Sequence, residues 1–240
     1  MENLHAKITY LVHSGFSVET SGHFLLFDYC PSLVRNPIIT SEFLKTKENI
    51  YVFVSQSCED HFDTDILHWQ KTNPSITYVF SSDVFCDRSD ISCHNCHIMS
   101  AYEQWTDRAI EIKTFGSTDD AVSFLVQADG LSVFHAGHLN WWRWKGETLE
   151  EQNYAEKIFK DEVDKIVGQK IDIAFFPVVG CLGEHAALGA EYFAAKLQPK
   201  LLIPMHLAGD LGVTKAFAEK AKAKSWATVE ITHDGQEILF

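Results

Sequence analysis

A run of potential metal ligands follows a short apolar segment in the first quarter of the chain. Tyr51–Val54 is apolar throughout and predicts a short buried strand, after which the chain continues as Ser55-Gln56-Ser57-Cys58-Glu59-Asp60-His61. Gln56 and Cys58 are two positions apart, so extended backbone would point both side chains to the same side. Asp60 and His61 follow at the turn and can converge on the same point. Because thiolate, imidazole and carboxylate groups are the usual ligands of zinc, this loop is a candidate metal site.

The loop resembles the metal-binding loop of the metallo-β-lactamase superfamily, in which His-x-His-x-Asp-His follows a buried strand. This chain holds Gln56-x-Cys58-x-Asp60-His61 in that frame, a degenerate form in which the last two positions match and the first two differ. The resemblance extends over nearly the whole chain and is strongest toward the bacterial metal-dependent hydrolases, a branch that includes the L-ascorbate-6-phosphate lactonases. It implies an α/β (α+β) fold, a four-layer αββα sandwich of two mixed sheets flanked by helices, with the site at one edge between the sheets.

Three further segments resemble the superfamily around its metals. His135-Ala136-Gly137-His138-Leu139-Asn140 resembles a strand-end His-Ala-Gly-Asp-Leu-Asn, so His138 stands where the family has a carboxylate that bridges two metals. The sequence PKLLIPMH, residues 199–206, resembles the segment that ends in the final metal ligand, here His206. The middle segment TFGSTDDAVSFLV lacks the third metal-binding His that many members carry there.

Mapped onto this chain, the resemblance implies one divalent metal rather than two. Asp60, His61 and His206 would hold it, with His138 or water as the fourth partner and Cys58 as a further candidate ligand. Asp60 and His61 would also be the catalytic residues, with Asp60 orienting the attacking water. Zinc is the expected ion, with manganese, iron, nickel or no metal as alternatives, and zinc would lower the pKa of a bound water to roughly 7. For each histidine, the alternative is an ordinary structural or exposed imidazole.

Several other residues are candidates for the surroundings of this site. Asp28, at the end of an early strand, stands where the superfamily has an Asp near the metal loop; the alternative is that it turns the chain before Pro31. His135 is expected to orient a ligand through a hydrogen bond, and His185, in a glycine-rich loop, is a candidate general acid. The remaining candidates are Gln56, the two tryptophans Trp141 and Trp142, as a pocket wall or as ordinary core, and His13, which follows the first expected strand.

The composition favours a small-molecule substrate. The 240 residues carry a net charge of −13 and no cluster of Lys or Arg, so nucleic acid and anionic membranes are poor partners. No apolar run is long enough to span a bilayer and no secretory leader is evident, so we expect a cytoplasmic protein. The sequence leaves open whether the protein forms a homo-oligomer.

The six cysteines are too few for a disulfide scaffold in a chain of this length, and a reducing compartment would leave them as thiols. Cys93-His94-Asn95-Cys96-His97 superficially suggests a zinc knuckle. Because no second pair stands at ligand spacing, the favoured interpretation is a polar loop with incidental thiols. Cys58, beside His61, has a catalytic alternative as a nucleophile.

Apolar strand-like runs alternate with amphipathic helices through both halves of the chain, residues 1–125 and 126–240, which predicts an α/β fold. Ligand-like residues fall just after strands in both halves, so we expect one domain over residues 1–240. Helices are predicted at 149–167, 186–197 and 213–224, and another, capped by Asp63 or Thr64, after the metal loop. Residues 86–97 are predicted to be irregular, with 229–232 and 236–240 as closing strands.

Two functions from different classes account for these residues. The first is a metal-dependent hydrolase of a small ester, lactone or phosphoester, with metal-activated water as the nucleophile. The second is a catalytically degenerate member of the superfamily that binds a ligand or partner without turnover, because the changes at Gln56, Cys58 and His138 all fall in the site. A thiol-based reaction at Cys58 is a third alternative, and it lacks any further triad residue.

Overall fold

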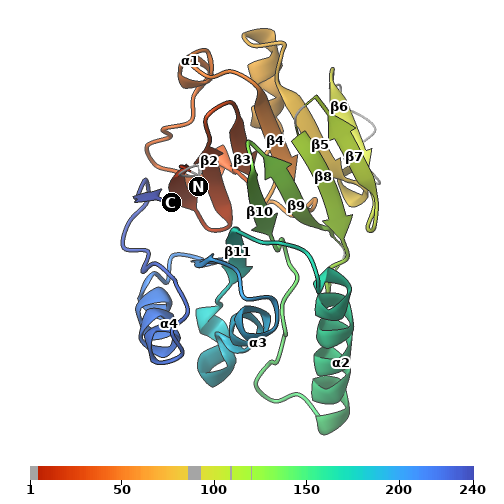
Figure 1. Cartoon of the computed structure of the whole chain (residues 1–240), viewed down its shortest axis with the longest axis vertical. Helices are drawn as coiled ribbons and strands as arrows, with labels where there is room; N and C mark the ends of the chain where they lie inside the picture. The colour runs from red at the N-terminus through yellow and green to blue at the C-terminus, as the bar shows by residue number, and fades with distance from the viewer. Residues whose placement is uncertain (1–4, 86–92, 109, 120) are drawn as a thin grey trace.

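The computed structural model describes residues 5–85, 93–108, 110–119 and 121–240. Its strands form two mixed β-sheets flanked by helices, so the predicted fold class is confirmed (Figure 1). The strands of the seven-stranded sheet are β1 (Lys7–Val12), β2 (Gly15–Glu19), β3 (Phe24–Phe27), β4 (Ile50–Val54), β5 (Thr77–Ser81), β6 (Cys96–Met99) and β13 (Glu237–Leu239). Their order is β13-β1-β2-β3-β4-β5-β6; β3 to β6 run parallel and the other neighbours antiparallel.

The six-stranded sheet contains the strands β7 (Gln104–Asp107), β8 (Ile110–Phe115), β9 (Ser123–Ala128), β10 (Leu131–His135), β11 (Ile173–Pro177) and β12 (Leu201–Met205). Its order is β12-β11-β10-β9-β8-β7, with β10, β11 and β12 parallel. The parallel strands are buried along their whole length, as expected for strands covered on both faces.

The long helices lie together beside the six-stranded sheet, at the bottom of Figure 1. The sequence-predicted helices are confirmed as α2 (Leu149–Ile166), α3 (Leu188–Leu197) and α4 (Gly212–Ala223). Thr148 and Glu151 form a capping box at the start of α2, and the helix buries Phe159, Val163 and Ile166, which share one face. The shorter helices are α1 (Ser41–Leu44), η1 (Pro31–Leu33), η2 (Thr64–Lys71), η3 (Ser82–Phe85) and η4 (Gly180–His185). Within the described residues, no helix combines the length and the apolar character needed to cross a bilayer.

Two apolar clusters hold these layers together. The larger one lies between the sheets and continues under α2 and α3, and the rings of Phe16 and Phe175 stack across it with centroids 4.2 Å apart. The smaller cluster lies on the other side of the seven-stranded sheet, where Leu44 of α1 and Ile66 of η2 are buried. Burying one Phe side chain stabilises the fold by about 1.5–3 kcal/mol. Packing of such rings between the sheets therefore favours the observed arrangement of the two sheets.

The carboxyl ends of parallel strands from both sheets meet at one edge of the sandwich. His13, Asp28 and Ser55 directly follow β1, β3 and β4, and His206 directly follows β12. Two backbone hydrogen bonds join the sheets there: the amide of His206 donates to the carbonyl of His13 over 3.0 Å, and that of Val122 to Ser55 over 3.1 Å. Side chains that are far apart in sequence are therefore held at a common edge.

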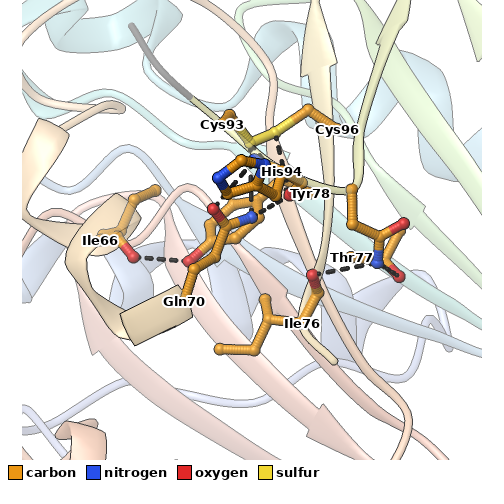
Figure 2. Close-up of a disulfide and its surroundings, with 9 residues drawn as sticks. Ile66, Gln70, Ile76, Thr77, Tyr78, Cys93, His94 and Cys96 are labelled. Carbon is orange, nitrogen blue, oxygen red and sulfur yellow. Dashed lines mark hydrogen bonds between the residues drawn. A yellow bond between two sulfur atoms is a disulfide. The ribbon is translucent and has the colours of Figure 1, made fainter. Parts of the chain in front are cut away.

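The segment around Cys93 differs from its prediction. Cys96 and His97 begin strand β6 rather than continuing a loop, and Cys93 is joined to Cys96 by a disulfide, not left as a thiol (Figure 2). Asn95 has a φ of 57°, and the resulting turn brings the two Cα atoms to 5.9 Å, within the usual range for a disulfide. Cys86, and the predicted irregular segment 86–92, lie outside the described residues.

Two other secondary-structure predictions need correction. The helix after the metal loop is the 3₁₀ helix η2, although Asp63 caps it as predicted by accepting a hydrogen bond from Asp65. The segment Val229–Thr232 does not form a strand. The amide of Ile231 donates to the Thr214 hydroxyl on α4 over 3.1 Å, so it is not available for a hydrogen bond to a neighbouring strand.

Candidate metal centre

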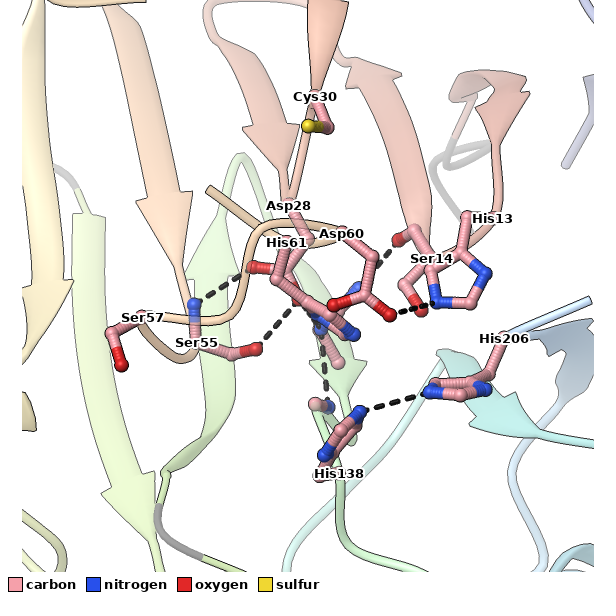
Figure 3. Close-up of polar contacts among 12 residues, drawn as sticks. His13, Ser14, Asp28, Cys30, Ser55, Ser57, Asp60, His61, His138 and His206 are labelled. Carbon is pink, nitrogen blue, oxygen red and sulfur yellow. Dashed lines mark hydrogen bonds and ion pairs between the residues drawn. The ribbon is translucent and has the colours of Figure 1, made fainter. Parts of the chain in front are cut away.

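Four side chains converge where the two sheets meet. The ligand atoms of His13, Asp60, His61 and His206 all lie within 4.8 Å of one another (Figure 3). His138 borders this group, with its Nε2 atom 2.8 Å from Nε2 of His206. The structure thus brings together Asp60, His61, His206 and His138, which the sequence placed around one cation, and adds His13.

A fully buried carboxylate, Asp28, fixes His61. Asp28 accepts hydrogen bonds from the Ser55 amide over 2.7 Å, the Ser55 hydroxyl over 2.6 Å and Nδ1 of His61 over 2.7 Å. His61 therefore carries its proton on Nδ1, and its buried Nε2 atom has no hydrogen-bond partner in the structure. An imidazole whose one nitrogen donates to a carboxylate while the other is left with a lone pair is the usual state of a metal-bound histidine.

His13 is held so that it faces Asp60. Its Nδ1 atom accepts a hydrogen bond from the Ala208 amide over 3.2 Å, so the proton of the neutral ring is on Nε2. That Nε2 atom lies 3.1 Å from the Asp60 carboxylate. The Asp60 side chain remains 42% exposed, so one side of the carboxylate is still open to solvent. His13 therefore positions Asp60 without covering it.

His138 is oriented from the opposite side. Its Nδ1 atom lies 3.4 Å from a carboxylate oxygen of Asp119, and its carbonyl accepts a hydrogen bond from the Thr118 hydroxyl over 3.2 Å. The Nε2 atoms of His138 and His206 face each other, and the other ring nitrogen of His206, Nδ1, is buried without a partner. Two imidazole nitrogens at this distance either share one proton or are drawn to a shared cation.

The backbone around the centre is strained. His13, Asp28 and His206 have φ values of 53°, 41° and 62°, in the left-handed region that non-glycine residues seldom adopt. Such residues persist only where the surrounding structure imposes them, and they cluster at functional sites. Gly137 also has a positive φ, and a Cβ atom there would lie 2.7 Å from the Val122 carbonyl oxygen, so only glycine fits.

Two histidines of the centre, His206 and His138, are held neutral. Burial, together with the neighbouring imidazoles of His13, His138 and His61, lowers the pKa of His206 to about 2, although Asp60 opposes this. Burial and then His61 lower the pKa of His138 to about 4. Both rings therefore keep a lone pair for a cation at neutral pH.

The carboxylates of the centre are held ionised. The contact with His13 holds the pKa of Asp60 well below its usual range, although burial opposes this. Burial alone would raise the pKa of Asp28, but His135 and His61, together with the hydrogen bonds from His61 and Ser55, bring it below the ordinary value. Both acids are therefore negatively charged at neutral pH.

The remaining candidates from the sequence have different positions. His135 is buried behind Asp28, 3.7 Å from its carboxylate, and its Nε2 donates to the Ser14 carbonyl over 2.9 Å. Gln56 is buried, with its side-chain nitrogen unpartnered. Cys58 is an exposed thiol outside the cluster of His13, Asp60, His61 and His206. Partial loss of hydration, together with Asp60, Asp119 and Asp83, raises its pKa. His185 lies in η4, with its ring 3.8 Å from Glu184.

The side chains of the two neighbouring tryptophans lie in different surroundings. Trp141 packs into the core against Phe159 and Tyr192, so the core alternative holds for it. Trp142 lies edge-on to His138 and His206, with ring centroids 5.6 and 5.7 Å away. Sequence reasoning left this choice open, and it placed His13 only at the same edge, without a role. A His directly after a buried strand and before a Ser-Gly turn was the one available signal for it.

The donor set fits a divalent metal. Imidazole nitrogens and a carboxylate are suitable ligands for zinc and for other first-row metals. The buried, unpartnered Nε2 atom of His61 marks where such a cation would replace a missing hydrogen bond. The outer carboxylate Asp28 and the anchored His13 are the kind of supporting groups that metal ligands require.

Comparisons with known proteins find similar chains that are named metal-dependent hydrolases. A UPF0173 metal-dependent hydrolase of Carboxydothermus hydrogenoformans is 26% identical over 254 residues, covering 97% of this chain and 99% of the relative. A UPF0173 metal-dependent hydrolase of Pelotomaculum thermopropionicum is 24% identical and covers 83% of each chain.

Among solved structures, the metallo hydrolase Igni18 of the archaeon Ignicoccus hospitalis shares the fold with a TM-score of 0.71, at 18% identity and 98% coverage of both chains. The metallo-beta-lactamase fold protein YhfI of Bacillus subtilis aligns with a TM-score of 0.63, at 12% identity, over 99% of this chain and 100% of its own. The family model described as the beta-lactamase superfamily domain matches residues 7–206. The resemblance drawn from the loop at residues 56–61 is thereby confirmed, and the chain belongs to the β-lactamase superfamily.

Proposed function

We propose that the chain is a metal-dependent hydrolase of a small ester, lactone or phosphoester, with one divalent metal held by Asp60, His61 and His206. The observation that carries this proposal is the convergence of these side chains from two segments far apart in the chain, residues 60–61 and residue 206, with Nε2 of His61 buried and unpartnered. The names of the relatives, metal-dependent hydrolases, support it. Because the candidate ligands come from both sheets, we also infer that residues 1–240 act as one domain.

Each residue of the centre has a distinct task in this proposal. Asp60, His61 and His206 would hold the ion, with His138 or water as the fourth partner. Asp28 keeps the proton of His61 on Nδ1, and His13 holds Asp60 in place. A divalent ion held there would polarise the scissile oxygen and make a water nucleophilic near neutral pH.

Asp60 serves as a ligand and orients the attacking water. Its exposed side can accept a hydrogen bond from a water that approaches from solvent. Because its pKa lies well below the ordinary value, Asp60 is a poor proton acceptor and a good hydrogen-bond acceptor. Asp60 therefore contributes to the reaction by orienting the water and by its negative charge, and it does not act as the general base.

A thiol reaction at Cys58 has less physical support. A nucleophilic cysteine needs a lowered pKa, whereas burial and three nearby carboxylates raise the pKa of this thiol. The degenerate alternative, ligand binding without turnover, retains one observation in its favour: Gln56 is buried where the superfamily has its first ligand, and its nitrogen has no partner.

One activity experiment separates these alternatives. Hydrolysis of 4-nitrophenyl acetate by the full chain should fall to the buffer rate after chelation, return when zinc or manganese is restored, and be unchanged in Cys58→Ala. Loss of activity in Cys58→Ala with resistance to chelation would instead support a thiol nucleophile. A metal-loaded protein that hydrolyses none of a panel of esters, lactones and phosphoesters would support the degenerate alternative.

A further inference from the structure

The disulfide between Cys93 and Cys96 lies within a single turn at one edge of the seven-stranded sheet. His94 and Asn95 alone separate the two cysteines, and Cys96 is the first residue of the edge strand β6. A disulfide stabilises a fold mainly by closing a loop in the unfolded chain, and the effect grows with the length of that loop. Because this loop is so short, the bond adds little to stability, and a structural role explains it poorly.

The turn keeps its shape through hydrogen bonds that involve no sulfur atom. The side-chain amide of Asn95 donates to the carbonyl of Ile76 over 3.1 Å and to the hydroxyl of Thr77 over 2.8 Å. The carbonyl of Asn95 accepts from the amide of Tyr78 over 3.0 Å. These contacts hold the turn against β5 and its preceding residue. Two reduced thiols would therefore stay close together, in a position to form the bond again.

One side chain of η2, Gln70, presents polar groups to the pair (Figure 2). It accepts a hydrogen bond from the amide of His94 over 3.1 Å and donates to the carbonyl of His94, which fixes the orientation of its own amide. The same Nε2 atom donates to Sγ of Cys93 over 3.5 Å. The carbonyl of His94 lies 3.5 Å from Sγ of Cys93 and 3.7 Å from Sγ of Cys96. The pair thus has a donor for a thiolate and an acceptor for a thiol.

Oxidation in this chain is selective for the pair. Cys93 and Cys96 are partly exposed, so a small reagent can reach their sulfur atoms. The other cysteines among the described residues, Cys30, Cys58 and Cys181, are free, although the last two are exposed. Proximity rather than exposure therefore decides which thiols are joined. Cys-x-x-Cys is also the spacing of the redox motif in thiol–disulfide oxidoreductases, where both the thiol and the disulfide forms are used.

We propose that Cys93 and Cys96 form a redox-active pair that exchanges with low-molecular-weight thiols and their disulfides, independently of the proposed hydrolase function. A small thiolate attacks Sγ of Cys96, and the electron pair of the broken bond leaves on Sγ of Cys93, where Gln70 stabilises the thiolate. A second small thiolate attacks the small-molecule sulfur of the mixed disulfide and releases Cys96. The two protons of the small thiols pass to the cysteines, so one protein disulfide and two small thiols give two protein thiols and one small disulfide.

Glutathione is the probe for this exchange. The full chain is equilibrated at a series of ratios of reduced to oxidised glutathione, with and without zinc, then quenched with acid, alkylated and analysed by peptide mass spectrometry. Cys93 and Cys96 should be joined in oxidised glutathione and both alkylated in excess reduced glutathione, with little mixed disulfide. Cys181, an exposed free cysteine, should instead form a mixed disulfide with glutathione. Circular dichroism should show the same fold in both forms, because the turn is held by Asn95.

The role of Gln70 has a separate test. The remaining thiol of Cys96→Ser and of Cys93→Ser is alkylated at neutral pH. Cys93 should react about 3- to 10-fold faster than Cys96, because Gln70 stabilises the Cys93 thiolate. Addition of Gln70→Ala should remove this difference. The matched control is Gln104→Ala, which removes an exposed glutamine of β7 that donates to Glu111, and it should leave the difference unchanged.

Several results would overturn the proposal. A disulfide that persists in excess reduced glutathione, or a fold that is lost when it is reduced, would show a structural bond. Thiols that stay reduced in oxidised glutathione, with or without zinc, would show that the pair is not redox-active, and protection by zinc alone would show a metal site instead. Cys86→Ser should leave the equilibrium unchanged, and a shift would show that Cys93 and Cys96 do not act as a pair. Equal alkylation rates in the two single variants would refute the assignment of Cys93 as the leaving thiolate.

Discussion

Asp28→Ala is expected to lower the free energy of unfolding by about 3–5 kcal/mol, because it leaves three buried donors without an acceptor and each unsatisfied buried group costs about 1–3 kcal/mol. The substitution leaves the Ser55 amide and hydroxyl and Nδ1 of His61 without their acceptor in a fully buried position. In a chain of this length, such a loss lowers Tm by roughly 10 °C. Metal affinity should fall by about 10- to 100-fold, because His61 loses the group that fixes its tautomer. Calorimetry and metal titration measure the two effects.

The pH dependence of this stabilisation has a definite sign. The pKa of Asp28 is lower in the folded chain than the ordinary value of about 3.9 in an unfolded one. Its contribution is therefore fully present above about pH 4 and is lost as the pH falls through the folded pKa. The difference in the free energy of unfolding between the wild type and Asp28→Ala should accordingly become smaller only at acidic pH.

Asp129→Ala is the matched control for this prediction. Asp129 also accepts a hydrogen bond from a backbone amide, that of Gly22, and pairs with an imidazole, His23, at the opposite end of the strands. Its removal should destabilise the fold and leave metal affinity unchanged. Equal losses of metal affinity in Asp28→Ala and Asp129→Ala would show that Asp28 acts through general stability alone.

His61→Ala is expected to reduce metal affinity by more than the 10- to 100-fold that typically follows the loss of an outer partner, because it removes a ligand atom. It also leaves the Asp28 carboxylate without one of its two imidazole neighbours. Hydrolysis should fall to the buffer rate. Metal titration followed by calorimetry, and the ester assay, measure these outcomes in the same preparation.

His233→Ala serves as its control, since His233 is exposed and its ring makes a hydrogen bond with the neighbouring Thr232, far from the candidate centre in sequence. This variant should bind metal and hydrolyse ester as the wild type does. If His61→Ala retained the affinity of the wild type for zinc and manganese, His61 would not be a ligand, and the proposed centre would be wrong.

The fold and the family could be predicted because both are indicated by local patterns in the sequence. Apolar runs followed by Asp28, Ser55 and His206 mark strand ends, and parallel strands of one sheet end at a common edge. The periodicity of α2 and its Thr148 cap are likewise local signals. Such features depend on a few neighbouring residues, so they can be detected in the sequence itself.

What could not be predicted depends on contacts between distant segments. Nothing near Trp141 and Trp142 indicates that the first faces Phe159 and the second faces His206, because the direction of each ring is set by the packing of α2 and β12. The role of His13 likewise depends on Ala208, almost two hundred positions later. The same holds for the disulfide, which forms because an Asn95 turn brings Cys93 to Cys96 at the start of strand β6.

The most direct test of the account is elemental analysis of the full chain, purified without a histidine tag and supplied in turn with zinc, manganese, iron and nickel. The account predicts about one firmly bound divalent ion per chain, as expected for a single set of imidazole and carboxylate ligands, and its loss in His61→Ala. A chain that retains none of these metals, or that holds the same amount in His61→Ala, would contradict the convergence of Asp60, His61 and His206 on a cation.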